Sequence, residues 1–284
     1  MNTGCIALLT DFGLDDIYVG VMKGVMCGLC PRARFIDITH SIAPQNVQQA
    51  AIALHDAHTY FPPGTVFLVI VDPGVGSDRR ALVAQAGGYS FVAPDNGVLS
   101  YTLARLPEVR CVELTTSSHS SVPYISRTFH GRDVFAPAAA QLAAGASLAS
   151  LGAPLTDIVV LPPPLLTLSA GVVTGEVTHV DGFGNIITSI GHLKWQPAGD
   201  NLLLSPRFGT SSPVTIQAQR AVVKVGDQVI VGIQATYSAV RPGDIMALVS
   251  SAGWLELAVN QGSAAARLNI ARGDQVRLTT SSEG

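Results

Sequence analysis

The sequence predicts two domains of different class: an α/β domain over residues 1–160, with a mostly parallel sheet flanked by helices, and an all-β, barrel-like domain over 171–284. In the first half, apolar runs typical of strands alternate with runs of helical period, which is the pattern of βαβ units. In the second half the helical pattern disappears and short strands follow one another between turns. A Pro-rich stretch, LPPPL at 161–165, begins the stiff linker expected over 161–170.

The first half is expected to contain strands that lead into loops and helices. A strand at 6–9 delivers Thr10 and Asp11 into a loop, and a helix follows over 17–29. Apolar residues at positions 47, 50, 54, 57 and 61 share one face of a helix, so the segment 46–61 is expected to be helical. The other segments expected here are strands at 34–38, 66–71, 81–86, 89–93 and 110–114 and an Ala-rich helix at 134–144.

The second half is expected to be built from strands joined by turns. The expected strands are 171–180, 185–190, 201–205, 214–217, 228–232, 246–249, 254–259 and 275–279. Two clusters between them, DGFGN at 181–185 and SSAGW at 250–254, contain the Gly, Asn and Ser residues of hairpin turns. A turn and a binding loop are both compatible with these residues.

Composition excludes several functional classes. The 284 residues carry a net charge of −3 and 48% hydrophobic residues, which gives no basic footprint for nucleic acid. Apolar runs stay well below the ~20 residues that span a bilayer. The N-terminus lacks the basic lead of a secretory signal, so a cytoplasmic location is expected.

The cysteines do not predict a disulfide framework or a metal site. Cys27 and Cys30 form a CxxC pair, which is compatible with redox chemistry or half a zinc site. They close a helical run, however, and a second CxxC is missing, so we interpret them as apolar filler. The histidines show no HxH or HExxH spacing either, and neither a metal nor another cofactor is expected.

The stretch VDPGVGSDRR at 71–80 is the leading candidate for a functional loop. Asp72 follows a buried strand, at the edge of an α/β sheet where ligands bind. Arg79 and Arg80 lie on the same loop, and either can pair with Asp72 or face an anion. A surface turn with solvated charges remains the alternative interpretation.

Four further residues, Asp11, Asp15, Asp16 and His130, are polar and lie at the expected ends of strands or starts of helices. Asp11 follows the first strand, and Asp15 and Asp16 precede the first helix, where capping is the simple explanation. His130 lies at the entrance to the Ala-rich helix, beside Arg132. A structural role for this histidine is the alternative to a catalytic one.

Taken together, the motifs resemble one family. They are TDFG at 10–13, VDPGVG at 71–76, APDNG at 93–97, FHGRD at 129–133, DGFGN at 181–185 and SSAGWLELAVNQGSAA at 250–265. In this order they are similar to the S-adenosylmethionine hydrolases, or hydroxide adenosyltransferases, which are related to fluorinases and chlorinases. The resemblance implies a homotrimer with active sites between the N-domain of one subunit and the C-domain of its neighbour. The implied substrate is a small molecule, with neither nucleic acid nor membrane as a partner.

The resemblance also implies a set of site residues. The catalytic set would be Asp72, Arg79 and His130. Asp11 would bind the ribose hydroxyls, Asp16 and Asp181 the methionine ammonium, and Ser251 its carboxylate. The remaining substrate-binding residues would be Phe183, Asn185, Tyr237, Val259 and Gln261, most of them around the adenine.

Two departures from the halogenases favour water as the nucleophile. Gly131 occupies the position expected to hold their halide-binding Ser, and Asp72 that of their ribose-facing Tyr. A carboxylate beside the reacting carbon repels a halide. Ala252 replaces an Arg of the halogenase pattern, so the methionine carboxylate must be bound in another way.

The implied reaction is substitution at the ribose 5′ carbon. Methionine leaves as a neutral group, so the protein mainly has to position the water. Pairing with Arg79 would make Asp72 a weak base, and we therefore expect Asp72 to orient the water while Arg79 and His130 stabilise developing hydroxide. A chlorinase on the same scaffold and a non-catalytic adenosine- or S-adenosylmethionine-binding protein are the alternatives.

Overall fold

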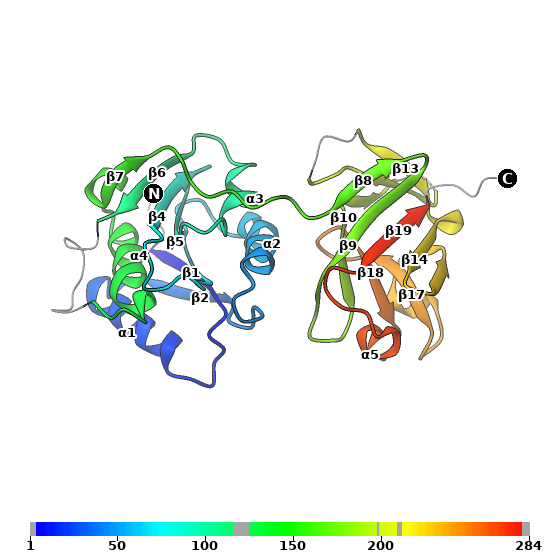
Figure 1. Cartoon of the computed structure of the whole chain (residues 1–284), viewed down its shortest axis with the longest axis horizontal. Helices are drawn as coiled ribbons and strands as arrows, with labels where there is room; N and C mark the ends of the chain where they lie inside the picture. Colours follow the sequence, from blue (N-terminus) through cyan, green and yellow to red (C-terminus); the bar gives the residue numbers. More distant parts are fainter. Residues whose placement is uncertain (1–3, 116–124, 198, 209–211, 280–284) are drawn as a thin grey trace. The chain divides into compact units, whose positions relative to one another are not determined.

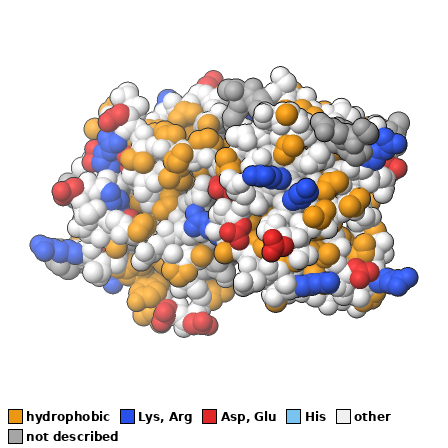
Figure 2. Space-filling view, turned by 45° about the vertical axis from the view of Figure 1, so that its right-hand side comes forward, with side chains coloured by type: hydrophobic (Ala, Val, Ile, Leu, Met, Phe, Trp, Pro, Cys, Tyr) orange, Lys and Arg blue, Asp and Glu red, His pale blue; other side chains and the backbone are white. Residues whose placement is uncertain are grey.

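The structure is a computed structural model that describes residues 4–115, 125–197, 199–208 and 212–279. The chain divides into two compact units, residues 1–161 and 162–284 (Figure 1). None of the described helices has the length and apolar character needed to cross a bilayer. On the face drawn in Figure 2, basic side chains are interspersed with acidic ones rather than gathered into a patch of one sign.

The first unit is a three-layer α/β structure. Its seven-stranded sheet has the order β2-β1-β3-β5-β4-β6-β7. The strands are β1 (Cys5–Thr10), β2 (Arg34–Thr39), β3 (Val66–Ile70), β4 (Ala81–Ala86), β5 (Tyr89–Pro94), β6 (Arg110–Leu114) and β7 (Gly152–Leu155). The helices are α1 (Tyr18–Leu29), α2 (Val47–Ala57), α3 (Ser100–Leu103), α4 (Ala136–Ala143), the 3-10 turns His58–Tyr60 and Leu148–Ser150, and a π-turn, Gly131–Phe135.

Alternate residues of the central strands pack against helices on opposite faces of this sheet. Ile6 and Leu8 of β1 contact the layer formed by α1 and α4, through residues such as Met22. Ala7 and Leu9 contact the layer that contains α2 and α3. Because side chains alternate along a strand, a strand buried on both faces is continuously apolar, as β1 is.

The expectation of a mostly parallel sheet is confirmed only in part, because the sheet is mixed. Strands β2, β1, β3 and β5 are parallel to one another. Beyond β5, each of the strands β4, β6 and β7 is antiparallel to the strand before it in the sheet order. Gly87 and Gly88 join β4 to β5 with φ of +56° and +84°. A two-residue connection can only join antiparallel strands, since a parallel pair needs a long crossover.

The second unit is a nearly closed, barrel-like sheet with a small second sheet. The large sheet has the order β15-β14-β19-β9-β10-β18-β17-β16, with β8 paired to β9, and β15 at one end lies against β17 near the other. Its strands are β8 (Leu166–Ser169), β9 (Val172–Val180), β10 (Ile186–Gly191), β14 (Val222–Val225), β15 (Gln228–Val231), β16 (Ile233–Gln234), β17 (Ile245–Val249), β18 (Trp254–Val259) and β19 (Gln275–Thr279).

The small sheet and the helices complete this unit. The small sheet is β11 (Leu193–Trp195), β12 (Asn201–Leu204) and β13 (Val214–Gln217). The helical segments are α5 (Ala264–Leu268) and the 3-10 helices η5 (Ala218–Arg220) and η6 (Tyr237–Ala239). Strand β8 occupies part of the range expected as a linker, because it pairs with β9.

Candidate active site

The carboxyl edge of the first unit's sheet brings two of the predicted aspartates to neighbouring strand ends. Strands β1 and β3 are parallel and adjacent, with Thr10 opposite Ile70. Asp11 and Asp72 leave the sheet directly after these strands. The loop that carries Asp72 then returns to the same edge, because β4 starts opposite Pro94, the last residue of β5.

Arg79 connects Asp72 to His130. Its Nε donates to both carboxylate oxygens of Asp72, at 2.9 and 3.1 Å, and its Nη2 forms an ion pair with Oδ2 at 2.5 Å. The same Nη2 donates to Nδ1 of His130 at 2.8 Å. The Asp72 side chain is 5% exposed and that of Arg79 11%, so solvent screens this contact little. Arg79 is the arginine that pairs with Asp72, since Arg80 pairs with Asp95 and Asp157.

The contact with Arg79 determines how His130 is protonated. A guanidinium only donates hydrogen bonds, so Nδ1 must accept and the proton of the neutral ring lies on Nε2. Burial lowers the pKa of His130, and the positive charge of Arg79 lowers it further, against the opposing effects of Asp72 and Asp133. His130 is therefore a neutral imidazole with an Nε2–H group that can donate to an oxygen atom.

The π-turn Gly131–Phe135 positions His130 at the start of α4. Asp133 in this turn is buried and accepts from the Ser126 backbone N–H at 2.8 Å and from Nε of Arg132 at 2.6 Å. Burial alone would raise the pKa of Asp133, but these hydrogen bonds outweigh it and the pKa is lowered. The ionised carboxylate thus ties the turn to the segment before His130.

The loop after β1 is held by His40, which was not predicted as a site residue. Oγ1 of Thr10 contacts Nδ1 of His40 at 2.8 Å, and Nε2 of the same ring lies 3.0 Å from Asp37. The His40 carbonyl accepts from Gly13 N–H at 2.8 Å. The carboxylate of Asp11 accepts from the backbone N–H of Gln45 at 2.8 Å.

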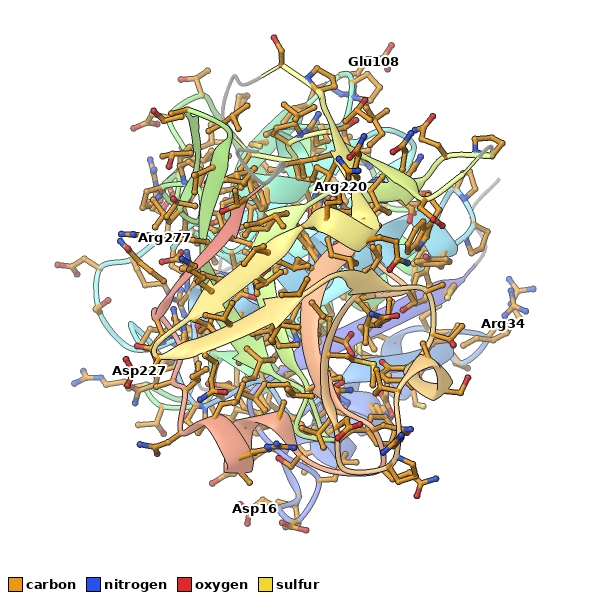
Figure 3. The ribbon with its side chains drawn as sticks, turned by 90° about the vertical axis from the view of Figure 1, so that its right-hand side faces the viewer. Asp16, Arg34, Glu108, Arg220, Asp227 and Arg277 are labelled. Atoms are coloured by element: carbon orange, nitrogen blue, oxygen red, sulfur yellow. The ribbon has the colours of Figure 1, made fainter. Side chains whose placement is uncertain are left out.

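Asp16 lies on an exposed loop before α1, and Figure 3 shows it projecting outward. The capping interpretation of Asp15 and Asp16 is wrong, because Ile17 is the N-cap and the first turn contains no acidic residue. No group among the described residues bonds the Asp16 carboxylate. This leaves it accessible to a ligand.

An aromatic cluster links this loop to the segment before His130. The rings of Phe12, Tyr18 and Phe129 meet edge to face, with centroids 5.1–6.1 Å apart. These rings were not predicted as site residues, although Phe12 and Phe129 lie within the TDFG and FHGRD motifs. They fix the position of His130 relative to Asp11 through apolar contact.

The second unit has an open pocket of about 430 Å³, a volume suited to a small molecule. It is lined by five predicted residues together with Gly262: Phe183, Asn185, Tyr237, Val259 and Gln261. The Phe183 ring is 82% exposed and Tyr237 is 45% exposed. The pocket therefore presents two accessible aromatic rings beside a buried amide.

Asp181 shapes the turn that carries Phe183 and Asn185. Its Oδ1 accepts from the backbone N–H groups of both residues at 2.9 Å, and its Oδ2 accepts from Nδ2 of Asn185 at 3.0 Å. The carboxylate fixes the Asn185 amide, since only its NH₂ end can face a carboxylate. Asp181 thus has a positioning role that the sequence did not predict.

Ser251 is not part of this pocket. The register pairs Ile186 with Leu257 and Gly191 with Trp254, so the turn containing Asn185 lies at the Val259 end of β18 and Ser251 beyond the other end. Six residues of strand separate the two ends by about 20 Å. Beside Ser251, the carbonyl of Ala252 accepts from Arg207 at 2.8 Å.

The remaining cysteines and histidines form no metal site in the described part of the chain. No three His, Cys, Asp or Glu side chains there come together as ligands. Cys27 is exposed on α1 and Cys30 follows its end, so Cys27 is not the apolar filler that we expected. His119 lies outside the described residues.

Comparisons with known proteins identify relatives along the whole chain. Residues 6–152 match the SAM hydroxide adenosyltransferase N-terminal domain, and residues 175–277 match the C-terminal domain of the same name. The chain is 40% identical to an (R)-S-adenosyl-L-methionine hydrolase of Salinispora tropica over 98% of both chains, and 31% identical to a fluorinase of Actinopolyspora mzabensis over 97% of both. An uncharacterised conserved protein of Thermotoga maritima superposes with a TM-score of 0.83 at 36% identity, covering 96% of this chain and 99% of the other.

Proposed function

Because this chain belongs to the SAM hydroxide adenosyltransferase family, we propose that it is an enzyme that hydrolyses S-adenosyl-L-methionine to adenosine and L-methionine. Water or hydroxide attacks the 5′ carbon of the ribose, and methionine leaves as a neutral thioether. The observation that carries this proposal is the contact of Arg79 with both Asp72 and His130 at the carboxyl edge of the sheet.

Each member of this set has a defined part in the proposed mechanism. Asp72 orients the attacking water through the lone pairs that Arg79 leaves free. The attacking water releases its proton to solvent, and the Nε2–H of His130 and the charge of Arg79 stabilise the negative charge that develops on its oxygen. Donors fixed in advance for such a charge are typically among the largest contributions to catalysis.

The substrate is held by groups from both units. Asp11 receives the ribose hydroxyls and Asp16 the methionine ammonium. The pocket lined by Phe183, Asn185 and Tyr237 takes the adenine, whose flat ring suits the two exposed aromatic side chains. Asp181 and Ser251 contribute to methionine binding in the family pattern, although the hydrogen bonds of Asp181 favour a role in holding Asn185.

We further propose a homotrimer, in which the first unit of one subunit and the second unit of its neighbour form each active site. Apolar side chains close to Asp16 support an interface there, since Leu14 is 70% exposed and Ile17 76%. Contiguous exposed apolar side chains often mark protein contacts.

The surroundings of Gly131 argue against chlorinase activity. A Cβ atom placed there would lie 3.0 Å from Sδ of Met22 and 3.1 Å from the Phe129 ring, so a serine would fit only if these neighbours shifted by a few tenths of an ångström. The Asp72 carboxylate would also repel a halide.

Turnover in ¹⁸O-labelled water tests the proposed function. We expect adenosine with the label in its 5′ hydroxyl, and kcat/KM about 10²–10³-fold lower in Asp72→Ala and His130→Ala. Asp78→Ala is the matched control, because Asp78 is an exposed carboxylate on the same loop. Three outcomes would contradict the proposal: unlabelled adenosine, 5′-chloro-5′-deoxyadenosine formed with added chloride, or intact substrate after long incubation.

A further inference from the structure

Strand β18 carries a buried acidic residue in an otherwise apolar run, WLELAV. Leu255, Leu257 and Val259 face the main core of the second unit. Glu256 points to the opposite face, as does Ala258, because side chains alternate along a strand. Glu256 is 3% exposed, and the small apolar cluster on this face consists of Met246, Leu248 and Ala258 with Val240 packed against it.

The carboxylate of Glu256 is bonded to a residue that lines the pocket. The hydroxyl of Tyr237 donates to Oε1 of Glu256 at 2.7 Å. Tyr237 begins η6, whose residues are all exposed. A second contact holds the end of this segment, where Nδ2 of Asn260 donates to the Val240 carbonyl at 2.8 Å. The hydroxyl of Tyr237 is therefore anchored while the residue as a whole stays 45% exposed at the pocket.

Stability does not explain a carboxylate at this position. Among the described residues, Tyr237 is the one hydrogen-bond partner of the Glu256 carboxylate, whereas Asp181 accepts three hydrogen bonds. Burial raises the pKa of Glu256, the hydrogen bond from Tyr237 opposes this shift, and the charge of Asp181 adds to it. A buried carboxylate with so few partners costs stability, and an apolar residue of similar size is often neutral or better.

We propose that Glu256 is a positioning residue, which fixes the Tyr237 ring as one wall of the pocket for the adenosyl group. The proposal rests on the proposed function of this pocket. It follows from the exposure of η6: a ring on a three-residue exposed turn has several accessible rotamers, and binding would have to order it. The bond to Glu256 orders the ring before the ligand arrives.

Four variants test this role: Tyr237→Phe, Glu256→Gln, Glu256→Leu and the double variant Tyr237→Phe/Glu256→Leu. For each variant we would measure steady-state kinetics, adenosine binding and thermal unfolding. Losing a hydrogen bond to a charged group corresponds to about a tenfold effect. We expect KM for S-adenosylmethionine and Kd for adenosine to rise about tenfold in Tyr237→Phe and Glu256→Leu, with kcat within about twofold. The double variant should be no worse than either single one, because both changes remove the same contact. Glu256→Gln keeps an acceptor and should bind nearly as the unmodified protein does.

The stability measurement separates positioning from a merely structural role. We expect the Tm of Glu256→Leu to equal or exceed that of the unmodified protein, since the substitution removes a buried carboxylate that has one hydrogen-bond partner among the described residues. Two variants are the matched controls and should leave KM unchanged. Tyr89→Phe loses a hydroxyl contact to the Phe61 carbonyl, and Glu176→Gln changes a carboxylate on β9. An unchanged KM in Tyr237→Phe, or a KM increase in Glu256→Leu that accompanies a lowered Tm, would overturn the inference.

The outcomes also distinguish this inference from the proposed function. If the unmodified protein releases no adenosine from S-adenosylmethionine, the proposed function fails, and the adenosine Kd of the variants still reports on Tyr237. If the unmodified protein is active and Tyr237→Phe has an unchanged KM and Kd, only the inference fails.

Discussion

His130 shows how a single hydrogen bond can select one protonation state. Because Arg79 donates to its Nδ1, the ring keeps its proton on Nε2, and burial and the charge of Arg79 lower its pKa. Protonation of Nδ1 would remove the acceptor and place two positive charges side by side. The sequence indicated these two residues but not this tautomer, because a tautomer depends on which atom the neighbour approaches.

The lowered pKa of His130 predicts an acid limb in the pH profile. Above its ordinary pKa of 6.5 the ring is neutral in folded and unfolded chains, so activity is fully present. As the pH falls below 6.5, His130 is protonated first in the unfolded chain. As the pH falls further, through the lowered pKa of His130 in the folded protein, the ring in the site is protonated as well. Both stability and activity should therefore decrease on the acid side.

Profiles of kcat/KM for the unmodified protein and His130→Asn check this prediction, because kcat/KM reports the pKa values of the free enzyme. The limb should be centred below 6.5 in the unmodified protein and missing from the residual activity of the variant. A limb that persists in His130→Asn would assign the titration to another group.

Most strands were predicted from the sequence, and the direction of some was not. Apolar runs and their turn signals locate β3, β9 and β18 to within a residue or two. The reversal at β4 is encoded in the two-residue Gly87 and Gly88 connection, which lies between the strands expected at 81–86 and 89–93. Short elements such as α3 and β16 depend on tertiary contacts, and four or fewer residues show no period.

The π-turn Gly131–Phe135 has little space at its first residue. We expect Gly131→Ser to destabilise the protein by about 1–3 kcal/mol, because the added Cβ meets Met22 and Phe129. It should also form no chlorinated product in the presence of chloride.

Denaturant unfolding and product analysis of Gly131→Ser test both parts, with Gly131→Ala as the control. The control adds the same Cβ without a hydroxyl, so the two variants should lose similar stability. Formation of 5′-chloro-5′-deoxyadenosine by Gly131→Ser alone would show that a hydroxyl at this position is sufficient for halide chemistry.

At the scale of the whole molecule, the candidate residues fall into two sets that lie in different units. Asp72, Arg79 and His130 belong to the first unit, and Asn185 and Tyr237 to the second. Asp72, Arg79, His130 and Asn185 lie in loops that the sequence analysis singled out, whereas Tyr237 lies outside these loops and was named from the family resemblance alone. The buried Glu256 and His40 were not singled out, because the sequence does not show which face of a strand or loop holds a partner.

Co-expression of two variants, each impaired in a different unit, tests the proposed trimer. If each site combines the first unit of one subunit with the second unit of its neighbour, co-expression of Asp72→Ala with Asn185→Ala should restore about a quarter of the activity, because random assembly creates that share of intact sites. The mixed protein should have the size of a trimer, 88.5 kDa for three chains of 29.5 kDa. Mixtures that stay inactive while forming mixed oligomers would assign each site to one subunit.

The reversal of β4 has a consequence for the entropy of assembling the site. Since the chain returns to the edge it left, Asp72 and Arg79 are only seven residues apart and close a short loop between two strand ends. His130 is 51 residues from Arg79, so its contact closes a much longer loop. Loop-closure entropy grows with length. The ion pair is therefore the contact with the lower entropic cost of the two. The histidine, which carries the donor for the reaction, is the residue whose position depends on the rest of the unit being folded.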